Sequence, residues 1–110
     1  MTDFLDVLAH DAKETVDSGY YKDLKAKSEN KVSLRKKIQN SRLNAIITEI
    51  KGASPSLGTI RRDINPKDIA RDMQKGGAIG ISVLTEPKHF NGSLQTLSIA
   101  RKAVDLPILM

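Results

Sequence analysis

The stretch IITEIKGASPS, residues 46–56, decides the fold of this chain. It begins as an apolar run rich in β-branched side chains, which is typical of a strand covered on both faces. Yet it carries Glu49 and Lys51 immediately before a Ser-Pro-Ser turn. A buried charge costs several kcal/mol unless it is paired or used. The two charges therefore predict either an ion pair that closes the strand or a reaction site.

The alternation of side chains along a strand sets the neighbours of these two charges. Ile47, Glu49 and Lys51 share one face, so we expect the two charged groups to lie within pairing distance. Ile46 and Ile50 share the other face and are expected to face helices. The charges also fall at the carboxyl end of the strand, where parallel β/α proteins place their sites. This position favours a site over a plain salt bridge.

Apolar runs and amphipathic helices alternate through the rest of the chain. Three runs have the composition of strands, at about residues 45–51, 79–84 and 107–110. A loop is expected after the first run, until Asn65-Pro66 opens a helix that Gly76-Gly77 ends. Ser93 is expected to cap a second helix. Short strands alternating with helices predict an α/β fold with a parallel sheet and right-handed crossovers.

The part of the chain before this pattern is rich in charge. Its scattered apolar side chains recur at helical spacing, as at Phe4 and Leu8. Ser18-Gly19 is expected to end a first helix, and Ser33 to cap a later one. We therefore divide the chain into an N-terminal helical extension, residues 1–42, and a β/α part, residues 43–110.

Composition excludes several classes of protein. The 110 residues are 28% charged and 39% apolar, which is ordinary for a globular protein. There is no cysteine, which excludes thiolate metal sites and fits a cytoplasmic protein. His10 and His89 lack the spacing of a metal site, so no metal is expected. No run approaches the roughly 18 apolar residues of a membrane span, so no membrane partner is expected.

The net charge of +5 raises the question of nucleic-acid binding. Arg35, Lys36 and Lys37 form the densest basic run. The chain has only two tyrosines, two phenylalanines and no tryptophan, and no recognisable nucleic-acid-binding motif accompanies the run. A solvated helix face is the preferred interpretation, and no nucleic-acid partner is expected.

Three segments carry a resemblance to a known family. They are IITEIKGASPSLG at 46–58, GGAIGISVLTEPKHFNGS at 76–93 and LPILM at 106–110. In this order and spacing they resemble the N-terminal portion of indole-3-glycerol phosphate synthase, and the helical leader resembles the extra N-terminal segment of that family. The combination of Glu-x-Lys-x-x-Ser-Pro-Ser with Ser-x-Leu-Thr-Glu and Phe-x-Gly-Ser is far more specific than a lone glycine pattern.

The resemblance implies a (β/α)8 TIM barrel, of which this chain would hold the N-terminal extension, the first two βα units and the third strand. It implies that the enzyme closes the ring of 1-(2-carboxyphenylamino)-1-deoxyribulose 5-phosphate. Carbon dioxide and water are lost, and the product is indole-3-glycerol phosphate, a precursor of tryptophan. The implied partner is this small phosphorylated substrate, and no cofactor is implied.

The same resemblance implies roles for individual residues. Glu49 and Lys51 match catalytic positions of the first strand, and Ser54 and Pro55 match the substrate-contacting Ser-Pro of the following loop. Ring closure places negative charge on a ketone oxygen, which an ammonium group such as Lys51 can hold or protonate. Glu49 can keep that lysine charged and oriented.

Two apolar positions and the end of the sequence complete the expectations. Leu84 and Phe90 resemble residues that line the pocket for the anthranilate ring, although both residue types are also common in a plain core. In the family a second catalytic lysine follows the third strand, whereas this sequence stops at Met110. The alternative to an enzyme is therefore a catalytically silent fragment. It would associate with the remainder of the barrel, or with other copies of the chain, through open strand edges.

Overall fold

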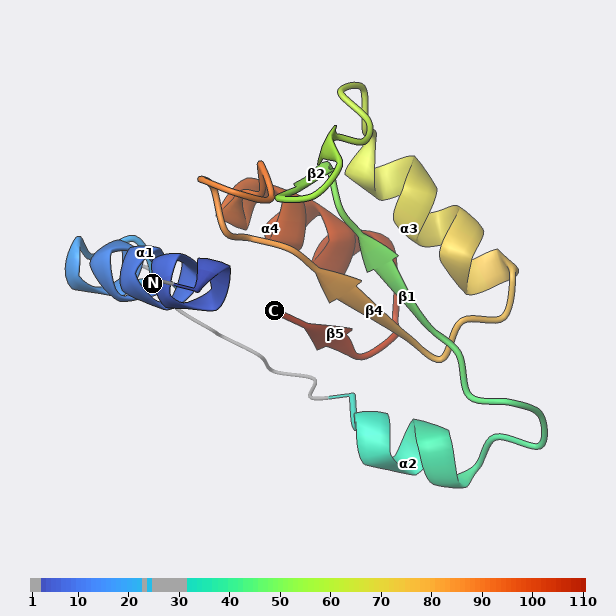
Figure 1. Ribbon diagram of the computed structural model, residues 1–110. Coiled ribbons are helices and arrows are strands. Elements are labelled where there is room, and N and C mark those ends of the chain that lie inside the picture. Colours follow the sequence, from blue (N-terminus) through green and yellow to red (C-terminus); the bar gives the residue numbers. More distant parts are fainter. Residues whose placement is uncertain (1–2, 23, 25–31) are drawn as a thin grey trace. The chain divides into compact units, whose positions relative to one another are not determined.

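The computed structural model of the protein describes residues 3–22, 24 and 32–110 (Figure 1). The chain forms two compact units, Met1–Asn30 and Lys31–Met110. The predicted division between an extension and a barrel part at residues 42 and 43 stays a prediction.

In the first unit, the helix α1 spans Phe4–Asp17. At its start, the backbone N–H of Asp3 donates a hydrogen bond to the carboxylate of Asp6 at 3.2 Å. The helix is capped at its end by Ser18, and Gly19 follows with φ +86°. A positive φ suits glycine, which confirms the expected break at Ser18-Gly19.

The second unit begins with the short helix α2, Leu34–Gln39. The hydroxyl of Ser33 accepts a hydrogen bond from the backbone N–H of Lys36 at 3.2 Å, which confirms the expected cap. Arg35, Lys36 and Lys37 are all exposed on this helix, in agreement with a solvated basic face.

A three-stranded parallel sheet forms the centre of the second unit (Figure 1). Its strands, in their spatial order, are β1 (Ile47–Ile50), β4 (Gly80–Val83) and β5 (Ile108–Leu109). Each strand lies inside the corresponding predicted run and is shorter than it. The parallel order confirms the α/β class, whereas closure into an eight-stranded barrel stays a prediction.

Two helices connect the strands of this sheet. α3 spans Pro66–Lys75 and α4 spans Leu94–Ala103, and the two pack on each other. The side chain of Asn65 accepts the backbone N–H of Asp68 at 3.3 Å, and Ser93 caps α4 in the same manner. Both predicted helix starts are therefore confirmed, because a local side-chain oxygen satisfies a first-turn donor.

The core lies between one face of the sheet and these helices. Ile50, Ile81 and Val83 pack there against the fully buried Ala70 of α3 and Ala100 of α4. The small alanine side chains let the helices approach the sheet closely. Ile50 faces helices as expected.

The same expectation for Ile46 is wrong. Ile46 lies just before β1 and is 58% exposed, so it lies outside the core cluster. β1 begins at Ile47, two residues after the start of the predicted run. The carbonyl of Ile46 still accepts the N–H of Ile79 at 2.9 Å, but the Ile46 side chain is not held against the helices.

The loop expected after β1 contains a small antiparallel hairpin. It consists of β2 (Ala53–Ser54) and β3 (Gly58–Thr59). Gly58 has φ +63°, a conformation that glycine adopts without strain, and the N–H of Leu57 donates to the hydroxyl of Ser54 at 3.2 Å. No described helix is both long and apolar enough to cross a membrane.

Candidate active site

Glu49 and Lys51 form an ion pair at the carboxyl end of β1. The ammonium nitrogen Nζ of Lys51 lies 2.8 Å from the carboxylate oxygen Oε1 of Glu49, which confirms the expected pairing. The Lys51 side chain is 33% exposed and the Glu49 side chain is 42% exposed. An ion pair this open to solvent contributes only about 0–1 kcal/mol to stability. This small value argues against a salt bridge retained merely to close the strand.

The open face of the sheet carries this pair. Ile47 precedes Glu49 on the same face and is 43% exposed, and Leu109 of β5 is 40% exposed. In a closed barrel this face is the interior one, and the carboxyl ends of its strands surround the site. The charged pair thus lies where that architecture places reactive groups.

Ser82 of β4 adds a polar contact that the sequence analysis missed. Register pairs Ser82 with Glu49, and the Ser82 hydroxyl donates to Oε2 of Glu49 at 3.5 Å. The two carboxylate oxygens of Glu49 therefore face different partners, Lys51 and Ser82. The sequence signal that could have drawn attention to Ser82 is the Ser-x-Leu-Thr-Glu motif, of which it is the serine. Ser82 lies two residues before Leu84 and hence on the same strand face as Leu84.

Ser54 and Pro55 lie in the hairpin that follows Lys51. Ser54 is half-buried, and its hydroxyl accepts the N–H of Leu57, while Pro55 is exposed. The carbonyl of Gly52 ties the hairpin to β1 by accepting the N–H of Ile60 at 2.8 Å. Among the described residues, no side-chain hydrogen bond joins Ser54 to Glu49 or Lys51. The structure therefore places the Ser-Pro step in the hairpin that follows β1, without a side-chain hydrogen bond from Ser54 to the charged pair.

Leu84 and Phe90 lie in the loop that leaves β4. Leu84 is half-buried, and its backbone N–H donates to the carbonyl of Ile50 at 3.2 Å, so it extends the pairing of β4 with β1. Phe90 is also half-buried. Both residues therefore follow the carboxyl end of the sheet, one strand away from Lys51.

A small cavity of about 130 Å³ lies at the same end of the sheet. Gly52, Leu84 and Thr96 are among its lining residues, together with side chains that begin α3. Glu49, Lys51 and Phe90 do not line it. The cavity is thus distinct from the charged pair and lies between the loops and the helix starts.

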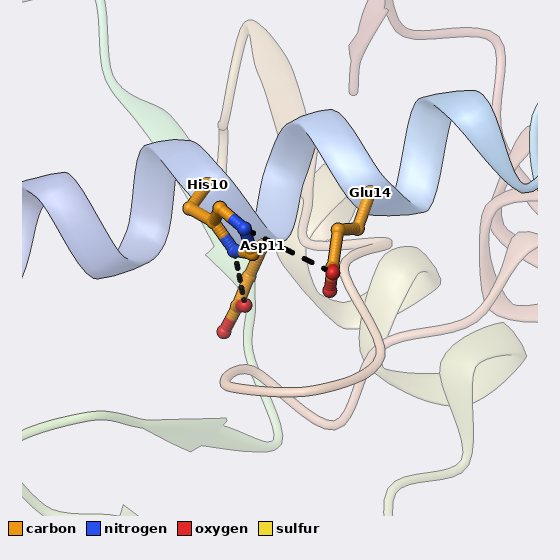
Figure 2. A group of neighbouring side chains, drawn as sticks. All are labelled: His10, Asp11 and Glu14. Atoms are coloured by element: carbon orange, nitrogen blue, oxygen red, sulfur yellow. Dashed lines mark hydrogen bonds and ion pairs between the residues drawn. The ribbon is translucent and has the colours of Figure 1, made fainter.

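His10, Asp11 and Glu14 form a cluster on α1, shown in Figure 2. The His10 ring nitrogens lie 3.4 Å from a carboxylate oxygen of Asp11 and 3.9 Å from one of Glu14. The His10 side chain is 70% exposed. Sequence analysis considered His10 only for its spacing from other metal ligands, whereas the helix brings it beside two carboxylates. The contact of His10 with Glu14 has the i, i+4 spacing at which side chains meet on a helix surface.

Comparison with known proteins identifies the family. Residues 5–110 match the family model described as indole-3-glycerol phosphate synthase. The enzyme of that name from Methanocaldococcus jannaschii is 48% identical over 93 residues, which cover 80% of this chain and 34% of that protein. The enzyme of the same name from Rippkaea orientalis is 52% identical over 65 residues, or 59% of this chain and 22% of that protein.

A third relative has the same name and a similar extent of match. This protein from Desulfosudis oleivorans is 55% identical over 64 residues, which cover 58% of this chain and 24% of that protein. The chain therefore spans about a third or less of the length of the relatives it matches. Because the family model covers nearly every residue and includes the whole sheet, the chain belongs to the indole-3-glycerol phosphate synthase family.

Proposed function

We propose that this chain supplies the first strands of an indole-3-glycerol phosphate synthase, a carboxy-lyase of tryptophan biosynthesis in the cytoplasm. Its substrate is 1-(2-carboxyphenylamino)-1-deoxyribulose 5-phosphate, which loses carbon dioxide and water to give indole-3-glycerol phosphate. The observation that carries the proposal is the Glu49–Lys51 pair, half-exposed at the carboxyl end of β1 in a chain of this family.

Lys51 is suited to the charge that develops during ring closure. A new carbon–carbon bond to the ketone carbon leaves negative charge on its oxygen, and the departing carboxylate returns its electron pair to the ring. One N–H of the ammonium group is directed to Glu49 at 2.8 Å, so its other donors remain for the substrate. Lys51 would hold the oxygen anion or protonate it.

Glu49 is proposed to hold Lys51 in position. A carboxylate at hydrogen-bonding distance restricts the rotation of an ammonium group. The half-buried side chains of Leu84 and Phe90 would form the apolar wall for the anthranilate ring. Ser54 and Pro55 would contact the substrate from the hairpin beside β1.

A completed barrel provides the test of this proposal. It joins this chain to the part of the Methanocaldococcus jannaschii relative that lies beyond the match, and it is called the completed barrel below. We expect ring closure, detected by the fluorescence of indole-3-glycerol phosphate, with the unaltered relative as a positive control. A folded completed barrel without turnover would contradict the proposal.

Ser82→Ala tests the weaker contact to Glu49. The hydroxyl lies at the long distance of 3.5 Å, so its loss should lower kcat by only roughly threefold in the completed barrel. Ser98→Ala, an exposed change on α4, is the matched control and should leave kcat unchanged. A loss of several hundredfold for Ser82→Ala would show that the serine has a direct role that this geometry does not support.

The open face of the sheet favours a second candidate, an association module. Exposed Ile47 and Leu109 lie on this face, and β1 and β5 are the edge strands of the described sheet. Open edges and apolar faces recruit other chains. We therefore expect the 110-residue chain on its own to self-associate in sedimentation experiments and to bind the remaining barrel segment when it is added. A monodisperse monomer that does not bind this segment would exclude the association module.

A further inference from the structure

The loop between β4 and α4 is organised by one acidic side chain, Glu86. Its carboxylate oxygen Oε1 accepts the backbone N–H of Lys88 at 2.9 Å. Its other oxygen, Oε2, accepts the N–H groups of His89 at 2.7 Å and Phe90 at 3.1 Å. The backbone carbonyl of Glu86 also accepts the N–H of Gly92 at 2.9 Å. One residue thus fixes four backbone donors of a single loop.

These hydrogen bonds order the loop backbone, as backbone hydrogen bonds order a helix or a strand. Residues in the loop have no ladder of backbone partners, and a carboxylate that accepts several N–H groups forms short, strong hydrogen bonds. Pro87 follows Glu86 directly, so the first position after it has a fixed φ and no donor that needs a partner. The loop therefore has one defined path, which depends on the carboxylate.

The two expected wall residues lie at opposite ends of this path. Leu84 ends the pairing of β4 with β1, while Phe90 is the last residue whose backbone the carboxylate of Glu86 holds. Gly92 then returns the chain so closely to Leu84 that a Cβ atom there would lie 2.1 Å from the Leu84 carbonyl oxygen. The separation of Leu84 and Phe90 is therefore set by the loop.

We propose that Glu86 is a positioning residue for substrate recognition. Its carboxylate holds the backbone of Phe90 so that the ring and Leu84 form one wall for the aromatic half of the substrate. This inference rests on the proposed function for the identity of the substrate. Glu86 would affect affinity for the aromatic half more than the chemical step, because its three side-chain hydrogen bonds go to the backbone of this loop and Lys51 pairs with Glu49.

Glu86→Ala and Glu86→Gln in the completed barrel test this role. Alanine removes all three side-chain hydrogen bonds and should raise KM roughly tenfold, with kcat within about twofold. Glutamine keeps one carbonyl oxygen, which can replace Oε2 and accept from His89 and Phe90. Its amide group cannot accept from Lys88, so KM should rise only about threefold. Asp72→Asn, an exposed acid-to-amide change on α3, is the control and should leave KM unchanged.

Two measurements that do not need turnover separate this inference from the proposed function. Amide hydrogen exchange at Lys88, His89 and Phe90 should become faster in both variants, most in Glu86→Ala. The affinity for anthranilate alone should fall in the same order. If the completed barrel has no turnover but its Glu86 variants show both changes, the proposed function is refuted. The role of Glu86 in positioning the loop is then still supported. Unchanged exchange, or faster exchange with unchanged KM and anthranilate affinity, would overturn the positioning role.

Discussion

Replacement of Lys51 by alanine in the completed barrel is expected to lower kcat by roughly a hundredfold to ten-thousandfold. The substitution removes the ammonium group that pairs with Glu49 at the carboxyl end of β1. Under the proposed mechanism, the negative charge that develops on the ketone oxygen then loses the ammonium group assigned to it. Initial rates at saturating substrate, followed by product fluorescence, measure the loss directly.

Thermal unfolding of the same variant decides between a site and a structural ion pair. The pair is half-exposed and contributes about 0–1 kcal/mol, so the midpoint temperature Tm should fall by no more than about 4 °C. Lys67→Ala, at an exposed position on α3, removes the same charge away from the site and should change neither kcat nor Tm appreciably. A large fall in Tm with nearly normal kcat for Lys51→Ala would mean that the pair only supports the strand.

The elements of the fold were predictable wherever the signal is local. Asn65-Pro66 and Ser93 specify helix starts through side-chain oxygens that bond to donors three residues later. Glu49 and Lys51 were also predictable as a pair, because strand alternation fixes their face whatever else the chain does. These features need only a few neighbouring residues.

Contacts that depend on distant residues were not predictable in this way. Ser82 meets Glu49 only because the register of β1 against β4 places them side by side, 33 positions apart in the sequence. Ile46 belongs to the same apolar run as Ile50 and its carbonyl accepts the N–H of Ile79 at 2.9 Å, but it precedes β1 and its side chain is 58% exposed. Where a strand ends is set by its partner strand, which composition does not reveal.

Glu86 shows a different limit of sequence analysis. From the sequence alone, a glutamate in a polar loop is interpreted as a solvated surface charge. The neighbouring residues do not predict that its carboxylate accepts three backbone hydrogen bonds. The loop conformation that creates these bonds depends also on Gly92 and its close approach to Leu84. The same loop therefore provides a strong test of how tightly this part of the fold is specified.

Gly92→Ala is expected to destabilise the completed barrel by roughly 3 kcal/mol or more, a fall in Tm of about 6–12 °C. A Cβ atom at this position would lie 2.1 Å from the carbonyl oxygen of Leu84 and 2.7 Å from the carbonyl carbon of Thr85. Both neighbours are backbone atoms at the end of β4, so no side-chain rotation relieves the overlap. The loop must move away from the sheet, which also breaks the hydrogen bond from Gly92 to Glu86.

Gly58→Ala is the matched control for this substitution. Gly58 has φ +63°, and a Cβ atom there would meet nothing within 4 Å, so alanine adds backbone strain of about 1–2 kcal/mol without a clash. Thermal unfolding of both variants should therefore show a clearly larger loss for Gly92→Ala. Equal losses would mean that positive φ matters more than the close approach at Gly92. In that case the loop of Glu86 would lie farther from β4 than the structure places it.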